Sequence, residues 1–260
     1  MYKIDVISSW LDIDQSYIKP VSLYVDTKIT NDNSNVSIAL LIEPREIFPS
    51  HHEYILNNYS KFDYILTYDS DILKLPNAIM FEFGSDWISR ESRPYSYPNK
   101  KLGISTVIGS KSITEGHRLR HALLNRYSEV KNSKFFKSSR GIVDDIHDIP
   151  MLGPSKYPLF DYQYSIIIEN TKSDYYFSEK LIDCLICKSI PIYWGARKIS
   201  NYFNGIIQVD NVDDIIKVSE RLDDNYYNNS IETINYNFEE SKKYCDLNNR
   251  IINKIKKIIE

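Results

Sequence analysis

The stretch YSIIIENTKSDYYFSEKLIDCLICKSIPIYWG, from Tyr164 to Gly195, decides how this chain is expected to fold. It begins with an apolar run of strand length, Tyr164–Ile168, and ends with a second one, Ile190–Trp194. Between them, Ser178–Lys188 has the apolar spacing of a helix. Two apolar strands joined by a helix are typical of a βαβ unit with parallel strands.

The first third of the chain repeats this alternation. His52–Tyr59 has the composition of a helix between two apolar runs. Strands alternating with helices predict a parallel sheet that is covered on both faces. The runs of strand length are Lys3–Ile7, Val36–Ile42, Asp63–Thr67 and Ala78–Phe83.

A polar stretch with two prolines, Arg93–Lys101, interrupts this periodicity and is interpreted as a linker. The predicted domains are residues 1–97 and residues 98–260, the second ending in a helix. We expect an α/β architecture in which two Rossmann-like domains face a cleft. Further elements predicted in the second domain are a strand, Leu102–Ile108, and helices at Gly116–Tyr127 and Asp213–Leu222.

Composition excludes several classes of protein. With 42% hydrophobic and 26% charged residues, the 260-residue chain is ordinary globular material, and its net charge of −3 argues against a nucleic-acid-binding protein. The beginning does not resemble a signal peptide, and no apolar run approaches the length of a spanning helix, so a soluble cytoplasmic protein is expected. Cys184 and Cys187 lie within a helical pattern and are interpreted as buried packing residues.

Polar residues follow the first strand of the decisive stretch. Glu169 and Asn170 come directly after Ile168, and ligands of open α/β sheets bind beyond the carboxyl ends of the strands. Ser178 is a plausible N-cap of the following helix, whose free N–H groups and dipole favour a pyrophosphate. Lys180 in the first turn adds a full positive charge.

Two neighbouring side chains suit the rest of a nucleotide. The Glu179 carboxylate can accept hydrogen bonds from the vicinal hydroxyls of a ribose, and Tyr176 can pack on a base or a sugar. A solvated helix start explains the same residues, and the physical argument alone does not separate the two interpretations.

Residues 164–183, followed by Ile190-Pro-Ile-Tyr-Trp-Gly and Tyr202-Phe-Asn, resemble the donor-binding motif of the α1,3/4-fucosyltransferases, glycosyltransferase family 10. Weaker similarity extends upstream to about residue 36. The resemblance implies a GT-B fold whose C-terminal domain holds the donor. It also implies transfer of L-fucose from GDP-β-L-fucose to a hydroxyl of an acceptor glycan, with inversion.

The resemblance assigns roles by position. Glu179 and Lys180 match the family's nucleotide-contacting pair, Tyr176 matches its motif tyrosine, and Asn170 follows the motif's glutamate. Ser178 completes the predicted donor-binding set as the helix cap.

A phosphate-binding arginine is expected upstream. The segment Ser110-Lys-Ser-Ile-Thr-Glu-Gly-His-Arg resembles the part of the family that leads to this arginine, which makes Arg118 the first choice and Arg120 the alternative. Arg118 and Lys180 together could neutralise the leaving diphosphate, so no metal or other cofactor is expected. Asp69-Ser-Asp71 spells the Asp-x-Asp of metal-using transferases and leaves a divalent ion as the less favoured alternative.

Inversion needs a base that takes the proton of the attacking hydroxyl. Glu43 ends an apolar strand and resembles the family's proposed catalytic glutamate by position, with Glu46 as a rival. The acceptor is expected to contact the loops His51–Ser60 and Trp87–Tyr97, whose chemistry does not name a sugar.

The sequence departs from the family pattern at Lys188, at Ala196-Arg197 and at Arg140-Gly141. Two alternatives therefore stay open: a glycosyltransferase of the same fold with another nucleotide-sugar donor, or a non-catalytic nucleotide-sugar-binding protein.

The last residues form an amphipathic helix with a stripe of Ile251, Ile255 and Ile258. Docking on the protein's own core is the favoured interpretation. Peripheral membrane contact is the alternative, because Lys254, Lys256 and Lys257 lie beside the stripe.

Overall fold

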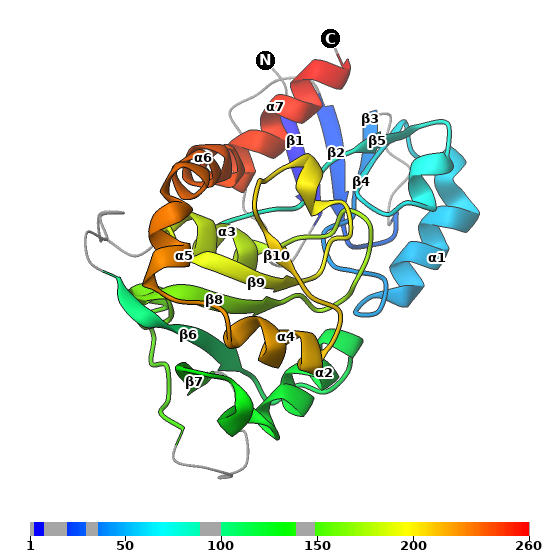
Figure 1. The fold of residues 1–260 in the computed structure, drawn as a ribbon. Helices are drawn as coiled ribbons and strands as arrows, with labels where there is room; N and C mark the ends of the chain where they lie inside the picture. The colour runs from blue at the N-terminus through cyan, green and yellow to red at the C-terminus, as the bar shows by residue number, and fades with distance from the viewer. Residues whose placement is uncertain (1–2, 8–19, 30–35, 89–99, 139–148, 260) are drawn as a thin grey trace. The chain divides into compact units, whose positions relative to one another are not determined.

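The computed structural model describes residues 3–7, 20–29, 36–88, 100–138 and 149–259 (Figure 1). Its contacts divide the chain into two compact units. The first contains residues 1–83, 173–176 and 247–260, and the second contains residues 84–172 and 177–246. Residues 89–99, which hold most of the predicted linker and of one predicted acceptor loop, lie outside the described residues, as do Arg140 and Gly141.

The first unit is a parallel sheet whose strands neighbour one another in chain order, β1-β2-β3-β4-β5. The four strands predicted in this part of the chain are present as β1, β3, β4 and β5. The strand β2 was not predicted. The helix α1, Pro49–Asn58, joins β3 to β4. The strands are β1 (Lys3–Ile7), β2 (Pro20–Val25), β3 (Val36–Leu40), β4 (Tyr64–Thr67) and β5 (Ala78–Met80), and the short 3-10 turns are η1 (Tyr59–Lys61) and η2 (Ile72–Lys74).

Both faces of this sheet are buried, which is why its strands are apolar at successive positions. Leu23 and Leu40 pack in the cluster on one face, and Tyr24 and Ala39, their neighbours in sequence, pack in the cluster on the other. Ile55 of α1 belongs to the second cluster.

The C-terminal helix α7, Leu247–Ile259, packs on the first of these faces (Figure 1). Ile251, Ile252 and Ile255 are buried in the same cluster as the strand residues. The stripe therefore docks on the protein's own core, the interpretation favoured over membrane contact. The contacts place this helix with the first unit, whereas the predicted division assigned it to the second domain.

The second unit contains another parallel sheet, ordered β10-β9-β8-β6-β7. The predicted βαβ unit is present as β8, α3 and β9. The apolar runs of the sequence do not predict β7. The strands are β6 (Lys101–Ile108), β7 (Ser133–Lys137), β8 (Tyr162–Ile168), β9 (Ile190–Trp194) and β10 (Ile207–Gln208). The helices are α2 (Glu115–Leu124), α3 (Glu179–Ile186), α4 (Val212–Ser219), α5 (Asp224–Asn229) and α6 (Ile231–Ser241), and the 3-10 turns are η4 (Tyr127–Glu129), η5 (Tyr157–Asp161), η6 (Ile199–Asn201) and η7 (Lys242–Tyr244).

This sheet too alternates its side chains between two cores. Ile166 and Ile168 of β8 pack with residues of α2 and α4, whereas Ile167 packs with α3. Cys184 and Cys187 are free thiols buried in the α3 cluster, as predicted.

The strand order places a topological switch point between β6 and β8. The chain leaves β6 towards β7 on one side, then returns to β8 on the other side. In open α/β sheets, ligands bind beyond the carboxyl ends of the strands at such a point. Within the described residues, no helix combines the length and apolarity that crossing a bilayer requires.

Candidate active site

A pocket of about 190 Å³ lies at the switch point of the second unit. The carboxyl ends of β6 and β8 form part of its wall. Its charged lining residues come from three parts of the chain and comprise three cations and one carboxylate, Arg120, Lys156, Lys180 and Glu179. This charge balance suits an anionic ligand that also carries hydroxyl groups.

The N-terminus of α3 borders this pocket. Ser178 has an extended backbone and caps the helix, because its side chain accepts a hydrogen bond from the N–H of Lys180 at 3.3 Å. The predicted cap is thus present. Ser178 is fully buried, so its role is to begin the helix at Glu179 and thereby present Glu179 and Lys180 to the pocket.

Glu169 fixes the position of this cap. Its carboxylate accepts hydrogen bonds from the main-chain N–H of Ser178 at 2.8 Å and from the Ser178 hydroxyl at 2.7 Å. Burial raises the pKa of Glu169, and the Lys180 ammonium, 3.8 Å away, opposes that rise. The sequence marked Glu169 as a polar strand end but not as a residue of the site.

Two glycines allow the chain to close around Glu169. A Cβ on Gly116 would lie 1.8 Å from the Glu169 carbonyl oxygen, and a Cβ on Gly195 would lie 2.7 Å from Glu169 Cγ. Both distances are far below van der Waals contact, so each position requires glycine.

Glu179, which is buried, pairs with Lys180, which is partly buried. Lys180 Nζ lies 3.3 Å from Glu179 Oε1 and 3.2 Å from the Ser178 hydroxyl. Burial alone would raise the pKa of Glu179, but Lys180 and Lys156 outweigh it and lower that pKa to about 2. Burial likewise opposes the charge of Lys180, and Glu179 and Glu169 reverse the effect and raise its pKa. Both groups are therefore ionised at neutral pH.

Lys156 is a further cation of the pocket that the sequence did not reveal. Its ammonium lies 2.7 Å from Asp183, 4.0 Å from Glu179 and 4.3 Å from the centre of the Trp87 ring. Asp183, fully buried on α3, also accepts hydrogen bonds from the N–H groups of Trp87 and Ile88. Asp183 follows Glu179 by one helical turn, so the two carboxylates lie on the same side of α3 and both can approach Lys156. This spacing is the signal in the sequence that could have revealed Asp183.

Of the two arginines that the sequence offered as phosphate-binding residues, Arg120 lines the pocket. Its Nε donates to the Ile168 carbonyl at 3.1 Å and its Nη2 to Asn170 Oδ1 at 3.2 Å. Arg118, the predicted choice, is exposed and donates to the Ile113 carbonyl at 2.9 Å. Arg120 lines the pocket and Arg118 does not, because two steps along a helix turn a side chain by about 200°. Which arginine binds phosphate stays a prediction.

Asn170 helps to seat α2 beside β8. Its carbonyl accepts a hydrogen bond from the N–H of Gly116 at 3.1 Å, while its side chain holds Arg120. Thr114 caps α2 by accepting a hydrogen bond from the N–H of His117. Asn170 therefore orients the arginine of the pocket.

Two predicted site residues belong to the first unit. Tyr176 is 2% exposed, and its ring packs at 5.1 Å from that of Tyr68. A ring buried in this way does not offer an open face for stacking on a base. Glu43 follows β3 and is half-buried. Its predicted role as the base stays a prediction.

The Asp-x-Asp sequence also lies in the first unit. Arg45 Nη2 contacts both carboxylate oxygens of Asp69 at 3.0 Å, and Lys74 contacts Asp71 at 2.8 Å. These basic partners occupy the oxygens that a divalent ion would use.

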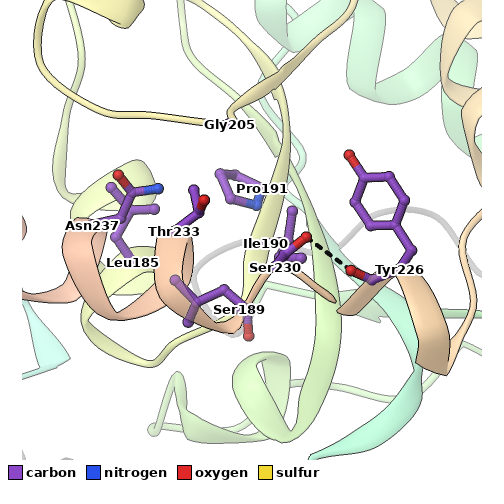
Figure 2. A pocket seen from close by; sticks show the side chains of 10 residues that line it. Leu185, Ser189, Ile190, Pro191, Gly205, Tyr226, Ser230, Thr233 and Asn237 are labelled. Atoms are coloured by element: carbon purple, nitrogen blue, oxygen red, sulfur yellow. Dashed lines mark hydrogen bonds between the residues drawn. The ribbon is translucent and has the colours of Figure 1, made fainter. Parts of the chain in front are cut away.

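A second, smaller pocket of about 70 Å³ lies at the amino end of β9 in the second unit (Figure 2). Ser189 and Pro191 line it from the strand side, and Ser230 and Asn237 from the side of α6. The Ser230 hydroxyl donates to the Tyr226 carbonyl at 2.8 Å, as Figure 2 shows, and Asn237 donates to the Asn204 carbonyl at 2.7 Å. The Ser230 and Asn237 side chains therefore already donate hydrogen bonds to main-chain carbonyls of the protein.

Comparison with known proteins gives a consistent picture. No protein-family profile matches the chain. A 65-residue segment, 25% of the chain, is 37% identical to the α-(1,3)-fucosyltransferase FucT of Helicobacter pylori and spans 13% of that relative's length. A crystal structure of an α1,3-fucosyltransferase with GDP-fucose aligns with a TM-score of 0.53 and 16% identity, covering 84% of this chain and 70% of that one. The resemblance to the α1,3-fucosyltransferases is confirmed.

The fucosyltransferase likeness extends to other GT-B glycosyltransferases. TarM aligns with a TM-score of 0.56 and 15% identity over 90% of this chain and 53% of its own. OtsA aligns with a TM-score of 0.52 and 11% identity over 83% of this chain and 66% of its own. The predicted α/β, GT-B-like fold class is confirmed.

Proposed function

We propose that this chain is a glycosyltransferase that binds a nucleotide-diphosphate sugar in the pocket at the switch point of the second unit. The observation that carries the proposal is the meeting of Arg120, Lys156 and Lys180 around Glu179 at the carboxyl ends of β6 and β8. A diphosphate needs positive charge, and a ribose offers two vicinal hydroxyls to an ionised carboxylate.

GDP-β-L-fucose is the proposed donor. The similarity to FucT and the shared fold with a fucosyltransferase that binds GDP-fucose support this choice. Lys180 and Arg120 face the diphosphate in this proposal, and Glu179 accepts the ribose hydroxyls. The two cations stabilise the negative charge that develops on the departing GDP.

Inverting transfer assigns the base to Glu43. Its carboxylate takes the proton of the acceptor hydroxyl while that oxygen forms a bond to the anomeric carbon of fucose. The bond from this carbon to the β-phosphate oxygen breaks, and GDP leaves with the electron pair. A carboxylate with its main chain held in place suits this step.

Donor identity can be tested by thermal-shift titration of the full chain with GDP, GDP-fucose, GDP-mannose and a UDP-sugar. We expect stabilisation by GDP and GDP-fucose, because ligands that bind only the folded state raise the melting temperature. Lys180→Met should lose the shift, and Lys217→Met, on the exposed side of α4, should retain it. Stabilisation by GDP-mannose or the UDP-sugar, with none by GDP-fucose, would contradict the fucose assignment.

Catalysis requires a separate test, a hydrolysis and transfer assay with GDP-fucose over a panel of acceptor glycans. We expect acceptor-dependent release of GDP that is abolished by Glu43→Gln. A non-catalytic binding protein would instead bind GDP without turnover, and Glu43→Gln would change nothing measurable.

A further inference from the structure

Side chains hold the main chain at Ile42 and Glu43 after β3 ends. The Asp26 carboxylate accepts the N–H of Ile42 at 2.9 Å and the N–H of Glu43 at 3.1 Å. The Tyr68 hydroxyl donates to the Ile42 carbonyl at 3.0 Å, and His52 Nε2 lies 3.1 Å from the Glu43 carbonyl. Each of the four main-chain polar groups of these two residues therefore has a side-chain partner, so side chains replace the neighbouring strand that would otherwise pair these groups.

The second ring nitrogen of His52 also faces an acceptor. His52 Nδ1 lies 3.2 Å from Asp69 Oδ2, and the imidazole is 1% exposed. Burial opposes ionisation of Asp69, but His52, two main-chain N–H groups and Arg45 lower its pKa to about 2, so this carboxylate accepts only. A carbonyl oxygen also accepts only. Both contacts are hydrogen bonds at the same time only when both ring nitrogens carry a proton, that is, when His52 is an imidazolium.

The groups around this imidazolium come from every element packed against it. Asp69 follows β4, Arg45 and Glu43 follow β3, and Asp26 follows β2. Burial raises the pKa of Asp26 to about 6, with Glu43 adding to the rise and His52 opposing it. His51, the neighbour on α1, has its pKa lowered by burial and by Lys28 and His52.

Loss of the His52 proton would leave one N–H for two acceptors. The bond to the Asp69 carboxylate is the stronger one, because charge-assisted hydrogen bonds exceed neutral ones. The bare Nε2 would then point its lone pair at the Glu43 carbonyl. The Glu43 carbonyl would lose its hydrogen bond from His52, which weakens the hold on the segment that carries the Glu43 side chain.

We propose that His52 is a positioning residue for Glu43, and that its imidazolium holds the Glu43 carbonyl so that transfer weakens as the imidazolium loses its proton with rising pH. This inference rests on the proposed function, in which Glu43 is the base. It gives the Asp69–His52 pair a role beyond folding, because a hydrogen bond that depends on protonation makes the placement of the base depend on pH.

The first experiment does not need activity. Long-range proton–nitrogen NMR spectra of the full chain, assigned with His52→Gln, should show both His52 ring nitrogens protonated at about pH 6. The main-chain amide signal of Glu43 should move with the titration of His52. One protonated and one bare nitrogen at that pH, or an unresponsive Glu43 amide, would overturn the inference.

The second experiment measures fucose transfer against pH. The wild-type kcat should fall by about tenfold or more through the His52 titration that NMR measures, since small misplacements of a catalytic group are costly. The KM for the donor should stay constant there, because the donor pocket lies in the second unit. His52→Gln keeps an N–H donor but cannot titrate, so its profile should lack this limb. His121→Gln, which removes a histidine bound to the Lys111 carbonyl, should retain it.

A variant that keeps His52 covers the case in which His52→Gln does not fold. Asp69→Asn removes the carboxylate that favours the imidazolium, so the limb should move to lower pH. A limb that persists in His52→Gln, stays in place in Asp69→Asn, or appears in the KM for the donor would contradict the inference. Absence of transfer with every donor would instead contradict the proposed function, and the NMR result would still decide the state of His52.

Discussion

The carboxylate of Glu169 binds Ser178 twice, through the main-chain N–H at 2.8 Å and through the hydroxyl at 2.7 Å. Glu169 directly follows β8 and Ser178 is the N-cap of α3, so this contact fastens the end of the strand to the start of the helix that follows it. Glu179 and Lys180 are the next two residues. The position of the charged pair in the pocket therefore depends on a buried carboxylate that does not itself line the pocket.

Glu169→Gln should weaken both stability and binding. The amide retains one acceptor oxygen but presents an NH₂ group to a site built from donors, so a buried hydrogen bond is lost. We expect a loss of about 1–3 kcal/mol in the free energy of unfolding, measured by urea titration, together with weaker binding of GDP. Glu220→Gln, on an exposed position, serves as the control. Equal unfolding curves for the two variants would contradict the structural role of Glu169.

Gly116→Ala should destabilise the second unit strongly. The new Cβ would meet the Glu169 carbonyl oxygen at 1.8 Å, and a backbone atom cannot move aside as a flexible side chain can. The expected loss exceeds about 2 kcal/mol in the free energy of unfolding. At Gly109 a Cβ would approach Ser138 Cβ no closer than 3.9 Å, so Gly109→Ala should leave the unfolding midpoint nearly unchanged. A tolerated alanine at 116 would show that α2 does not pack on β8 as described.

Substitution of the two arginines should separate their roles. Arg120→Met removes a cation that lines the pocket and should weaken GDP binding by about 10- to 100-fold, the value of a hydrogen bond to a charged group. Arg118→Met changes an exposed side chain and should leave the Kd for GDP within about twofold. Isothermal titration of both variants measures the difference. The reverse order of effects would restore Arg118 as the phosphate-binding residue.

The ionised state of Glu179 predicts a pH dependence of stability. A carboxyl group whose folded pKa lies below its unfolded value stabilises the fold above the unfolded pKa, and this contribution is lost as pH falls towards the folded pKa. The pKa of Glu179 is lowered from 4.5 to about 2, chiefly because Lys180 and Lys156 outweigh the opposing effect of burial.

The advantage in unfolding free energy of the wild type over Glu179→Gln should therefore shrink between about pH 5 and pH 2, by on the order of 2–3 kcal/mol. Urea titrations at several pH values measure this difference. Glu232→Gln, on an exposed position of α6, should run parallel to the wild type. A constant difference for Glu179→Gln across this range would show that Glu179 is not held ionised by its neighbours.

Ile255→Ala should destabilise the first unit. Ile255 is 1% exposed in the core that α7 shares with β2 and β3, and a buried isoleucine replaced by alanine costs about 2–5 kcal/mol. Lys257→Ala, on the exposed side of α7, should change stability little. Thermal unfolding compares the two. If Ile255→Ala unfolded like the wild type but bound anionic vesicles less well, the stripe would serve a membrane instead of the core.

The sequence by itself determined the parts of this protein that depend on local patterns. Apolar runs of strand length around a helical period predicted β8, α3 and β9, because burial on both faces of a parallel sheet leaves a continuous apolar signature. Ser178 was recognisable as a helix cap for the same reason, since capping involves only neighbouring residues. Glu179 and Lys180 followed from their places after that cap. Less periodic strands such as β2 and β7 escaped this reasoning.

Only the tertiary structure decided which polar side chains meet. Arg120 faces the pocket because of the rotation of α2 against β8, and the sequence of α2 does not contain that rotation. Lys156 and Asp183 are 27 positions apart, and His52 reaches Glu43 only because α1 folds back beside β3. The physical reason is that periodicity records which residues leave water, whereas hydrogen bonds and ion pairs depend on where separate elements pack. Those long-range contacts built the site from residues whose own surroundings in sequence are unremarkable.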